Sequence, residues 1–388
     1  MPGDAVRGGA MSGDAAGAAP PPGEAGSVAI VGGGVIGLLT AVECARAGAR
    51  VTLVDRGEIP SPRATSYDRH RVVRALHRGS AALTQAAANA GAAWQQAVPG
   101  AWHGTGALTA VPAGEAQSTV DWLALLGVRA ETVGSAELAA RWPTVRFPAG
   151  LAGVYEPAAG TVLADRALGT LANWLRRQPN VELHPQRRAV AVSSGKVEFV
   201  AGSALSADSV IVAAGPWSRE LVPAEDLTLY RQSMLAYDPG AARSAWAGVP
   251  AIPRLGTPEG AWLMPPVAGR PVRLSAASAC RPVAELAGRE TPARWRAHLT
   301  ALFADLLAGF DNTAVLGAKD AYYLSAAGPD GGPLLADLGA GCWAYAACGG
   351  MSFKFAPAIA AALADRALGR TPRPTGIDPI DRPREGSR

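Results

Sequence analysis

The stretch that decides the fold covers residues 27–55 and reads SVAIVGGGVIGLLTAVECARAGARVTLVD. Residues 27–31 are apolar enough to form a short buried strand. Residues 35–47 repeat apolar side chains with the period of a helix and stop at Gly48, a residue type that commonly ends helices. Residues 51–55 are a second apolar run. The stretch therefore predicts a strand–helix–strand unit.

The glycines between the first strand and the helix form a recognisable binding motif. Gly32, Gly34 and Gly37 fit the pattern G-x-G-x-x-G. The first permits a tight turn, the second lets the backbone approach a pyrophosphate, and the third lets helix and strand pack closely. Asp55 ends the second strand 23 residues after Gly32, where an acid that binds a ribose belongs. A glycine-rich turn can also be purely structural, but this combination favours dinucleotide binding.

The rest of the chain continues the alternation of helices and strands. Helices are expected at 79–97, 164–178, 294–310 and 352–369, and strands at 197–200 and 209–215. This order indicates an α/β protein. The strand at 209–215 ends in Ala213, Ala214 and Gly215, small residues that would let the backbone pass close to a cofactor. That feature favours FAD over NAD, although an ordinary strand and turn would look the same.

Length and composition exclude several classes of protein. With 388 residues and about 150 residues per domain, two or three domains are expected. The net charge is only +4 and no basic stripe is present, so nucleic acid is not an expected partner. No apolar run reaches the ~18 residues of a membrane span. Four cysteines without a Cys-x-x-Cys pair and five scattered histidines predict no metal site and a reducing, cytoplasmic location.

The two ends of the chain differ from its centre. Residues 1–26 are rich in Gly, Ala and Pro and lack the apolar run of a secretory signal, so we expect a disordered tail. Met11 is an alternative start within it. Residues 371–388 are rich in proline and charge and are expected to form a tail along the surface.

Landmarks along the chain extend the interpretation to a family. They are VAIVGGGVIG (28–37), HRVVRALH (70–77), RWP (141–143), VYEPAAGTV (154–162), VIVAAGPWS (210–218), YRQ (230–232), PDGGPLL (329–335) and GGMSFKFAP (349–357). In this order, over about residues 27–385, the chain resembles the amine-oxidising flavoproteins of the D-amino-acid-oxidase superfamily. Within it, the chain is similar to the group of monomeric sarcosine oxidase and N-methyltryptophan oxidase. The pairing of R-x-x-R after the second strand with F-K-F before the last helix is the more specific signal.

The resemblance implies two domains with the active site between them. One is a Rossmann-type FAD-binding domain assembled from residues 27–80, 150–220 and 320–370. The other is a mixed-sheet substrate domain from residues 81–149 and 221–319.

Residues expected to contact FAD lie in the fingerprint, around Asp55 and in turns that would face the cofactor. They are Gly32, Gly34, Val35, Ile36, Gly37, Asp55, Arg56, Ser66, Gly215, Trp217, Gly350, Ser352 and Lys354.

Two arginines and a lysine are candidates for the substrate chemistry. Arg71 and Arg74 are three residues apart, which would place both on one face of a helical turn, although such pairs are commonly solvated surface arginines. The resemblance implies that Arg71 lies against the flavin ring and that Arg74 clamps a substrate carboxylate. Lys354 stands between two phenylalanines, where it either snorkels to solvent or faces an anion. It matches the family lysine that pairs with the substrate carboxylate. His70 and His77 are interpreted as structural.

Several positions depart from the pattern of the family. Asp320 stands where sarcosine oxidase has a cysteine bonded to the flavin, so noncovalent FAD is expected. Arg273 replaces the oxygen-activating lysine, which predicts slow reaction with oxygen. Cys348 is offset from the attachment position and is interpreted as a packing residue.

The substrate pocket is expected to be less polar than that of sarcosine oxidase. Trp262 and Met351 replace a family tyrosine and histidine, and Tyr230 is a further pocket residue. A bulkier or cyclic amino acid fits such a pocket better than sarcosine.

The function expected from these features is FAD-dependent oxidation of the C–N bond of an amino acid or an N-alkyl or cyclic amino acid to an imine. Dioxygen would be the acceptor, giving hydrogen peroxide, and the protein would act as a monomer. Three alternatives remain open: a dehydrogenase that passes electrons to a quinone or carrier, a non-catalytic FAD-binding subunit, and an NAD-dependent dehydrogenase.

Overall fold

The computed structural model describes residues 26–200, 202–223, 227–326, 334–347, 349–375 and 380–382. Apart from Gly26, the tail expected at 1–26 lies outside the described residues. Cys348 also lies outside them, and so does most of the expected tail at 371–388.

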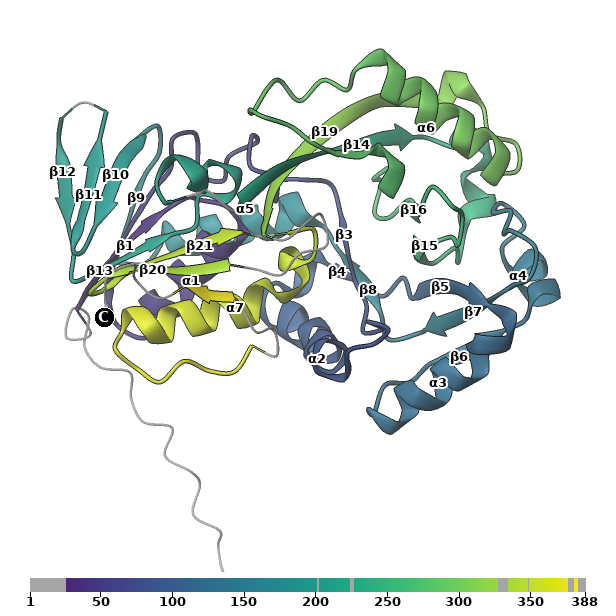
Figure 1. Cartoon of the computed structure of the whole chain (residues 1–388), viewed down its shortest axis with the longest axis horizontal. Coiled ribbons are helices and arrows are strands. Elements are labelled where there is room, and N and C mark those ends of the chain that lie inside the picture. Colours follow the sequence, from purple (N-terminus) through teal and green to yellow (C-terminus); the bar gives the residue numbers. More distant parts are fainter. Residues whose placement is uncertain are drawn as a thin grey trace, which may run out of the picture.

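A seven-stranded sheet holds the glycine fingerprint (Figure 1). Its strand order is β22-β20-β21-β13-β1-β2-β9. The strands are β1 (Ser27–Val31), β2 (Arg50–Val54), β9 (Val181–His184), β13 (Ser209–Val212), β20 (Leu334–Gly339), β21 (Cys342–Ala347) and β22 (Ile380–Arg382). The core strands β9, β2, β1, β13 and β21 are parallel, and β20 pairs antiparallel with β21. The predicted strand–helix–strand unit is therefore confirmed. The expected tail contributes an edge strand, β22.

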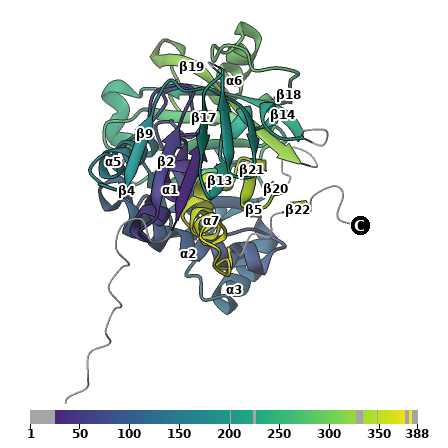
Figure 2. The ribbon, with the colours of Figure 1, turned by 90° about the vertical axis from the view of Figure 1, so that its left-hand side faces the viewer.

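Both faces of this sheet are covered by other elements. Successive side chains of β1 point to opposite faces, so each face contributes its own side chains to the core. Val28 and Ile30 pack against α1 (Val35–Arg46), α5 (Ala164–Leu175) and α7 (Ser352–Ala367). Ala29 and Val31 pack against a small sheet of β10 (Ala189–Ser193), β11 (Lys196–Phe199) and β12 (Ala204–Ser206). Figure 2 shows α1 and α7 side by side.

A second, larger mixed sheet forms the other half of the molecule. Its order is β18-β14-β17-β16-β15-β5-β7-β6, with β19 paired to β14. The strands are β5 (Ala107–Pro112), β6 (Glu131–Val133), β7 (Leu151–Glu156), β14 (Leu227–Tyr237), β15 (Ala251–Arg254), β16 (Ala261–Met264), β17 (Val272–Ala276), β18 (Cys280–Pro282) and β19 (Val315–Ala326). Helix α6 (Ala293–Leu306) packs on β14 and β17, and α3 (Ala116–Leu125) and α4 (Ser135–Arg141) pack on β7.

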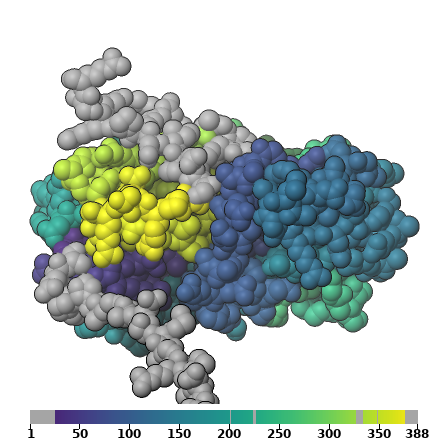
Figure 3. Space-filling view, turned by 90° about the horizontal axis from the view of Figure 1, so that it is seen from below, coloured from purple at the N-terminus to yellow at the C-terminus, as the bar shows by residue number. Residues whose placement is uncertain are grey.

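A small sheet and a helix connect the two halves. Strands β3 (Arg71–Val73), β8 (Gly160–Val162) and β4 (Trp102–His103) form the sheet. Helix α2 (Ala81–Ala97) packs against α7, and the two surfaces adjoin in Figure 3. The helical turn expected at Arg71 and Arg74 is wrong, because residues 71–73 pair as a strand with Gly160–Val162.

The strands do not divide at the boundaries expected for the domains. Strand β7 belongs to the large sheet, although residues 150–220 were assigned to the FAD-binding domain. Strand β19 is paired with β14 of the large sheet up to Ala326 and also contacts β21 of the first sheet. The division into discontinuous domains stays a proposal.

Candidate active site

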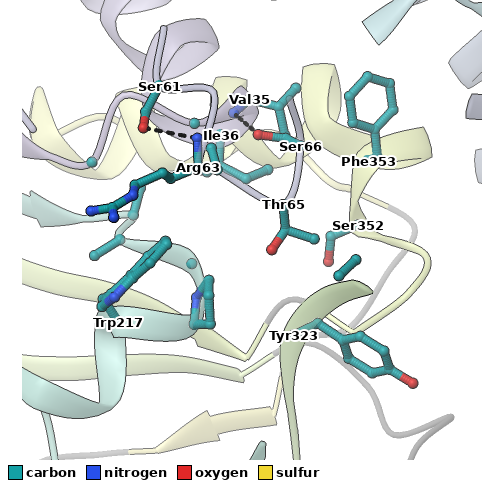
Figure 4. Close-up of a pocket in the computed structure, with 18 of the residues that line it drawn as sticks. Val35, Ile36, Ser61, Arg63, Thr65, Ser66, Trp217, Tyr323, Ser352 and Phe353 are labelled. Carbon is teal, nitrogen blue, oxygen red and sulfur yellow. Dashed lines mark hydrogen bonds between the residues drawn. The ribbon is translucent and has the colours of Figure 1, made fainter. Parts of the chain in front are cut away.

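A cavity of about 360 Å³ extends from the fingerprint turn to the large sheet. Figure 4 shows residues from several segments around it, among them Val35, Ser66, Trp217, Tyr323 and Ser352. Residues of both large sheets therefore line the same cavity.

The fingerprint glycines are required by close backbone contacts. Gly32 has φ +115°, and a Cβ there would lie 2.3 Å from the Ala213 carbonyl oxygen. A Cβ on Gly37 would lie 1.9 Å from the Gly32 carbonyl oxygen. Gly37 is absent from the cavity wall, so its role is the packing of helix on strand, whereas Gly32 and Gly34 line the cavity. A backbone cradle without side chains is what a pyrophosphate needs.

The segment that follows the fingerprint completes this end. Val35 and Ile36 line the cavity, and the Val35 N–H donates to Ser66 Oγ at 3.1 Å. Asp55 follows β2 and accepts hydrogen bonds from the Gly33 and Gly57 N–H groups, both at 2.7 Å. Burial raises the pKa of Asp55, while these two donors oppose the rise.

An arginine and a tryptophan continue the wall beyond Asp55. The Arg56 guanidinium lies 5.3 Å from the Trp217 ring centroid and 3.4 Å from a Glu220 oxygen. Gly215, Gly350 and Ser352 also line the cavity, as expected from the sequence. The wall includes further residues that sequence reasoning missed: Arg63, Thr65, Arg187 and Arg188. Arg187 and Arg188 are adjacent in the sequence and could have been noticed there, but no sequence pattern indicates that they lie near Asp55.

A charged group centred on Asp68 adjoins the opposite end of the cavity, although Asp68 itself does not line it. Its carboxylate pairs with Arg273 and lies 3.4 Å from the Arg71 guanidinium. Arg71 also donates to the Thr65 carbonyl at 2.7 Å, and Arg273 donates to the His70 carbonyl at 3.2 Å. Both arginines line the cavity. This group places two cations and one shared carboxylate at the end formed by the large sheet.

Burial and mutual contact shift the pKa values in this group. Burial alone would raise the pKa of Asp68, but Arg273 and Arg71 outweigh it and hold the carboxyl below its usual range. Burial lowers the pKa of Arg273 to about 10, with Asp68 opposing the shift. Burial also lowers the pKa of His70 to about 3. His70 is therefore neutral near pH 7, as a structural histidine would be.

Aromatic and apolar side chains complete this end. Trp262, on β16, lies 5.7 Å from the Arg273 guanidinium. Tyr323 lines the cavity and stacks on Tyr230 at 5.5 Å between ring centroids, so Tyr230 supports the wall from behind. Met351 is also behind the wall, packed against the core around α7. Gln232, Met234 and Tyr345 line the cavity and were not expected from the sequence.

Arg74 and Lys354 meet in a second charged group outside the cavity wall. Lys354 Nζ lies 3.1 Å from His77 Nε2. Glu156 accepts hydrogen bonds through Oε2 from the Ala75 and Leu76 N–H groups at 2.6 and 3.1 Å.

Two polar atoms of this group are unused within the described part of the chain. Arg74 Nη1 and Glu156 Oε1 are buried there without a hydrogen-bond partner. Burial, then Arg74, lowers the pKa of Lys354 well below its ordinary value. Burial, then Lys354, lowers the pKa of His77 to about 3. This group therefore has an unused donor, and burial favours the neutral form of its lysine.

Asp320 does not face the cavity, which corrects the reason given for noncovalent FAD. Its side chain is fully buried, pairs with Arg231 and Arg281, and accepts a hydrogen bond from Thr291 Oγ1 at 2.6 Å. The adjacent Ala321, and Tyr323 two residues further on, line the cavity instead. Neither side chain has a sulfur atom that could form a thioether to the flavin. Noncovalent FAD therefore remains the expectation, but because of these two residues rather than Asp320.

The fold and this cavity define a protein that binds a dinucleotide. Residues 27–366 match the family described as FAD dependent oxidoreductase, and the chain belongs to that family. The residues fit FAD: the cradle at Gly32 excludes side chains, Asp55 closes the next strand, and the cavity runs on to two buried arginines. The resemblance drawn from the sequence is confirmed.

Curated relatives include three oxidases. Peroxisomal sarcosine oxidase of Homo sapiens is 25% identical over 201 residues, 50% of this chain and 51% of that protein. Monomeric sarcosine oxidase of Bacillus sp. (strain B-0618) is 25% identical over 221 residues, 53% and 56% of the two chains. Glycine oxidase of Pseudomonas aeruginosa is 34% identical over 220 residues, 50% and 57%. The chain thus spans about half the length of the curated relatives it matches.

Solved structures share the fold over most of their length. NikD, described as an unusual amino acid oxidase essential for nikkomycin biosynthesis, has a TM-score of 0.73 at 20% identity, covering 88% of this chain and 93% of that one. Amadoriase I, a fructosyl amine:oxygen oxidoreductase from Aspergillus fumigatus, has a TM-score of 0.72 at 18% identity, covering 89% and 87%. At such identities these structures establish the fold, and the predicted combination of a Rossmann-type sheet and a mixed sheet is confirmed.

Two further features are absent from the described residues. No helix there has the length and apolar character needed to cross a membrane. No three His, Cys, Asp or Glu side chains among those residues gather as a metal site would require.

Proposed function

We propose that this chain uses FAD to oxidise the C–N bond of an amino acid, or of an N-alkyl or cyclic amino acid, to an imine, with dioxygen as acceptor. The observation that carries the proposal is the buried group of Arg74 and Lys354 next to the cavity. The residues Arg71 and Phe353, close to them in the chain, line the cavity. The names of the curated relatives, sarcosine oxidase and glycine oxidase, support an amino-acid substrate.

In this proposal Arg74 and Lys354 bind the substrate carboxylate. The buried Arg74 Nη1 has no hydrogen-bond partner among the described residues, so it is available to an incoming oxygen. Glu156 holds the segment after Arg74 in place through two backbone N–H groups. A carboxylate would also stabilise the ammonium form of Lys354, which burial and Arg74 disfavour. An amino acid would therefore bind with its carboxylate at this group.

The other residues of the cavity orient the substrate and set the charge around it. When bound, FAD supplies the two-electron chemistry of C–N oxidation. Arg71 and Arg273 line the cavity, and in this proposal their positive charge would stabilise the negative charge that develops during the reaction. Trp262, Met234 and Tyr323 form a largely apolar wall that suits a bulky or cyclic side chain.

Asp68 favours a second candidate, a dehydrogenase that passes electrons to a quinone or carrier. A cation that promotes the reaction of reduced flavin with oxygen acts through its uncompensated charge. Arg273 is instead paired with Asp68. Reaction with oxygen would then be slow. Production of hydrogen peroxide in air distinguishes the two candidates.

The proposed partners are a small-molecule amino acid and an electron acceptor, and the protein is proposed to be a cytoplasmic monomer. Cys44 and Cys342 are not in disulfides, which supports a reducing compartment. Size-exclusion chromatography with light scattering measures the oligomeric state directly.

An anaerobic screen of primary, N-methyl and cyclic amino acids tests the proposed activity. Loss of the visible flavin absorbance identifies a substrate, and no loss with any of these compounds would exclude the proposal. Acid precipitation of the same protein tests noncovalent binding. All yellow colour should appear in the supernatant, whereas colour in the pellet would reveal a covalent bond.

A further inference from the structure

A second recess lies on the outer side of the wall formed by Arg273 and Met234. It has a volume of about 180 Å³, and both residues also line the FAD cavity. Strands β14, β17 and β19 form it together with residues 68 and 69. The β14–β19 register places Lys319 opposite Met234. One layer of side chains therefore separates this recess from the cavity.

The recess contains four cationic side chains and a single carboxylate. The cations are Arg69, Arg273, Arg289 and Lys319, and the carboxylate is Asp68. Asp68 is already shared between Arg273 and Arg71. Within the described residues, Asp68 forms no ion pair with the other three cations.

Backbone groups hold Arg289 without neutralising it. Its Nε donates to the Asp320 carbonyl at 3.1 Å and its Nη1 to the Pro62 carbonyl at 3.0 Å. Within the described residues, Arg69, Arg289 and Lys319 form no ion pair. Glu290 pairs with Lys319 only through backbone groups, in an isolated antiparallel β-bridge. Arg289 is thus a preoriented donor with its charge available.

The cations destabilise one another in this position. Burial, then Arg289, lowers the pKa of Lys319. Burial lowers the pKa of Arg289; the charge of Asp68 opposes this shift, and the charge of Arg71 adds to it. An anion among these groups would relieve this repulsion, and it would accept charge-assisted hydrogen bonds from a guanidinium and an ammonium.

We propose that this recess is a binding site for a small anion that carries a carboxylate or phosphate group, separate from the substrate site. Arg69, Arg289 and Lys319 surround the anion, and the Asp68–Arg273 pair forms the floor. The volume suits a single such group rather than a nucleotide. The site does not depend on the proposed oxidase activity, because its residues bind the anion whether or not an amino acid is oxidised.

The lysine content of the chain permits a direct test. The sequence has only three lysines, Lys196, Lys319 and Lys354, so selective ¹³C labelling of lysine gives three Cε signals in the FAD-loaded protein. Inorganic phosphate and acetate are titrated separately at constant ionic strength. The Lys319 signal, assigned by Lys319→Gln, should move and saturate with at least one anion. The Lys196 signal should stay, because Lys196 already pairs with Glu198 at 2.6 Å.

Matched arginine variants sharpen the test. Arg69→Gln should weaken the anion about tenfold, the loss expected for one charge-assisted contact, and Arg289→Gln should do the same. Arg166→Gln is the control, since Arg166 is an exposed arginine bound to the Gly100 carbonyl at 3.0 Å, away from the recess. The tighter of the two anions identifies the preferred group. Movement of Lys319 that never saturates, or an Arg69→Gln protein that binds as well as the parent, would overturn the proposal.

Discussion

Two buried charged groups each contain two basic side chains and one carboxylate, but their hydrogen bonding differs. In the first, Arg71 and Arg273 surround Asp68, and the carboxylate pairs with both. In the second, Arg74 and Lys354 lie near Glu156, but that carboxylate accepts from backbone N–H groups instead. In the first group the carboxylate forms ion pairs with both arginines, although Arg71 Nε has no hydrogen-bond partner among the described residues. In the second group neither Arg74 Nη1 nor Glu156 Oε1 has a hydrogen-bond partner among those residues. The difference indicates that the first group shapes the electrostatics of the cavity and the second awaits an anion.

The largest expected effect is on the free energy of unfolding, which should differ between variants of the two groups. Asp68→Asn leaves Arg71 and Arg273 without their partner, and removal of one member of a buried ion pair costs about 3–5 kcal/mol. Glu156→Gln should cost less, about 1–3 kcal/mol, because the amide oxygen can still accept from the backbone and Lys354 can release its proton. Urea unfolding of the FAD-loaded proteins measures both. Equal losses would show that the two carboxylates have the same role.

Substrate binding tests the second group next. Lys354→Met should lower kcat/KM for an amino-acid substrate by a factor of tens or more, because loss of one member of a buried charged contact costs about 2–5 kcal/mol. Decarboxylated analogues should be poor substrates of the parent and change little in the variant. Lys196→Met, at an exposed lysine paired with Glu198, is the control. An unchanged specificity constant in Lys354→Met removes this lysine from carboxylate recognition.

The pH dependence of binding tests the charge of Lys354. Burial, then Arg74, lowers its pKa from 10.5, so the free protein loses this charge well below that pH. A carboxylate binds the ammonium form, so KM should rise as the pH increases from the lowered pKa towards 10.5. His77, with a pKa of about 3, stays neutral throughout and adds no step. Lys354→Met should abolish the rise, and persistence of the rise in that variant would assign it to another group.

The smallest expected effect concerns oxygen and the first group. Arg273→Lys places a compact charge where the guanidinium spreads it, so reoxidation of the reduced protein by air should become severalfold faster. Stopped-flow absorbance measures this rate, and the rate of anaerobic reduction serves as the control. If the lysine variant reoxidises no faster, Arg273 is not the cation that meets oxygen.

Particular residues show how far sequence reasoning reached. Gly32, Gly34, Asp55 and Trp217 were expected at the cofactor and line the cavity, because their positions follow from local turn and strand geometry. Asp320 was expected beside the flavin and faces away from it. A one-residue difference along a strand reverses the face, and the sequence does not reveal which face of β19 is turned to the cavity.

The strand–helix–strand unit, the family and the types of residue that meet at the site can be predicted from the amino-acid sequence. Those features depend on contacts between residues close in the chain, which periodicity and spacing record. The separation of Arg71 and Arg74 into different groups follows from the tertiary structure, because Arg71 begins strand β3 and Arg74 lies beyond its end. The tertiary structure also decided that Asp68 pairs with Arg273, more than 200 residues later in the chain. Pairings of this kind depend on how two sheets meet, and no local pattern specifies that arrangement.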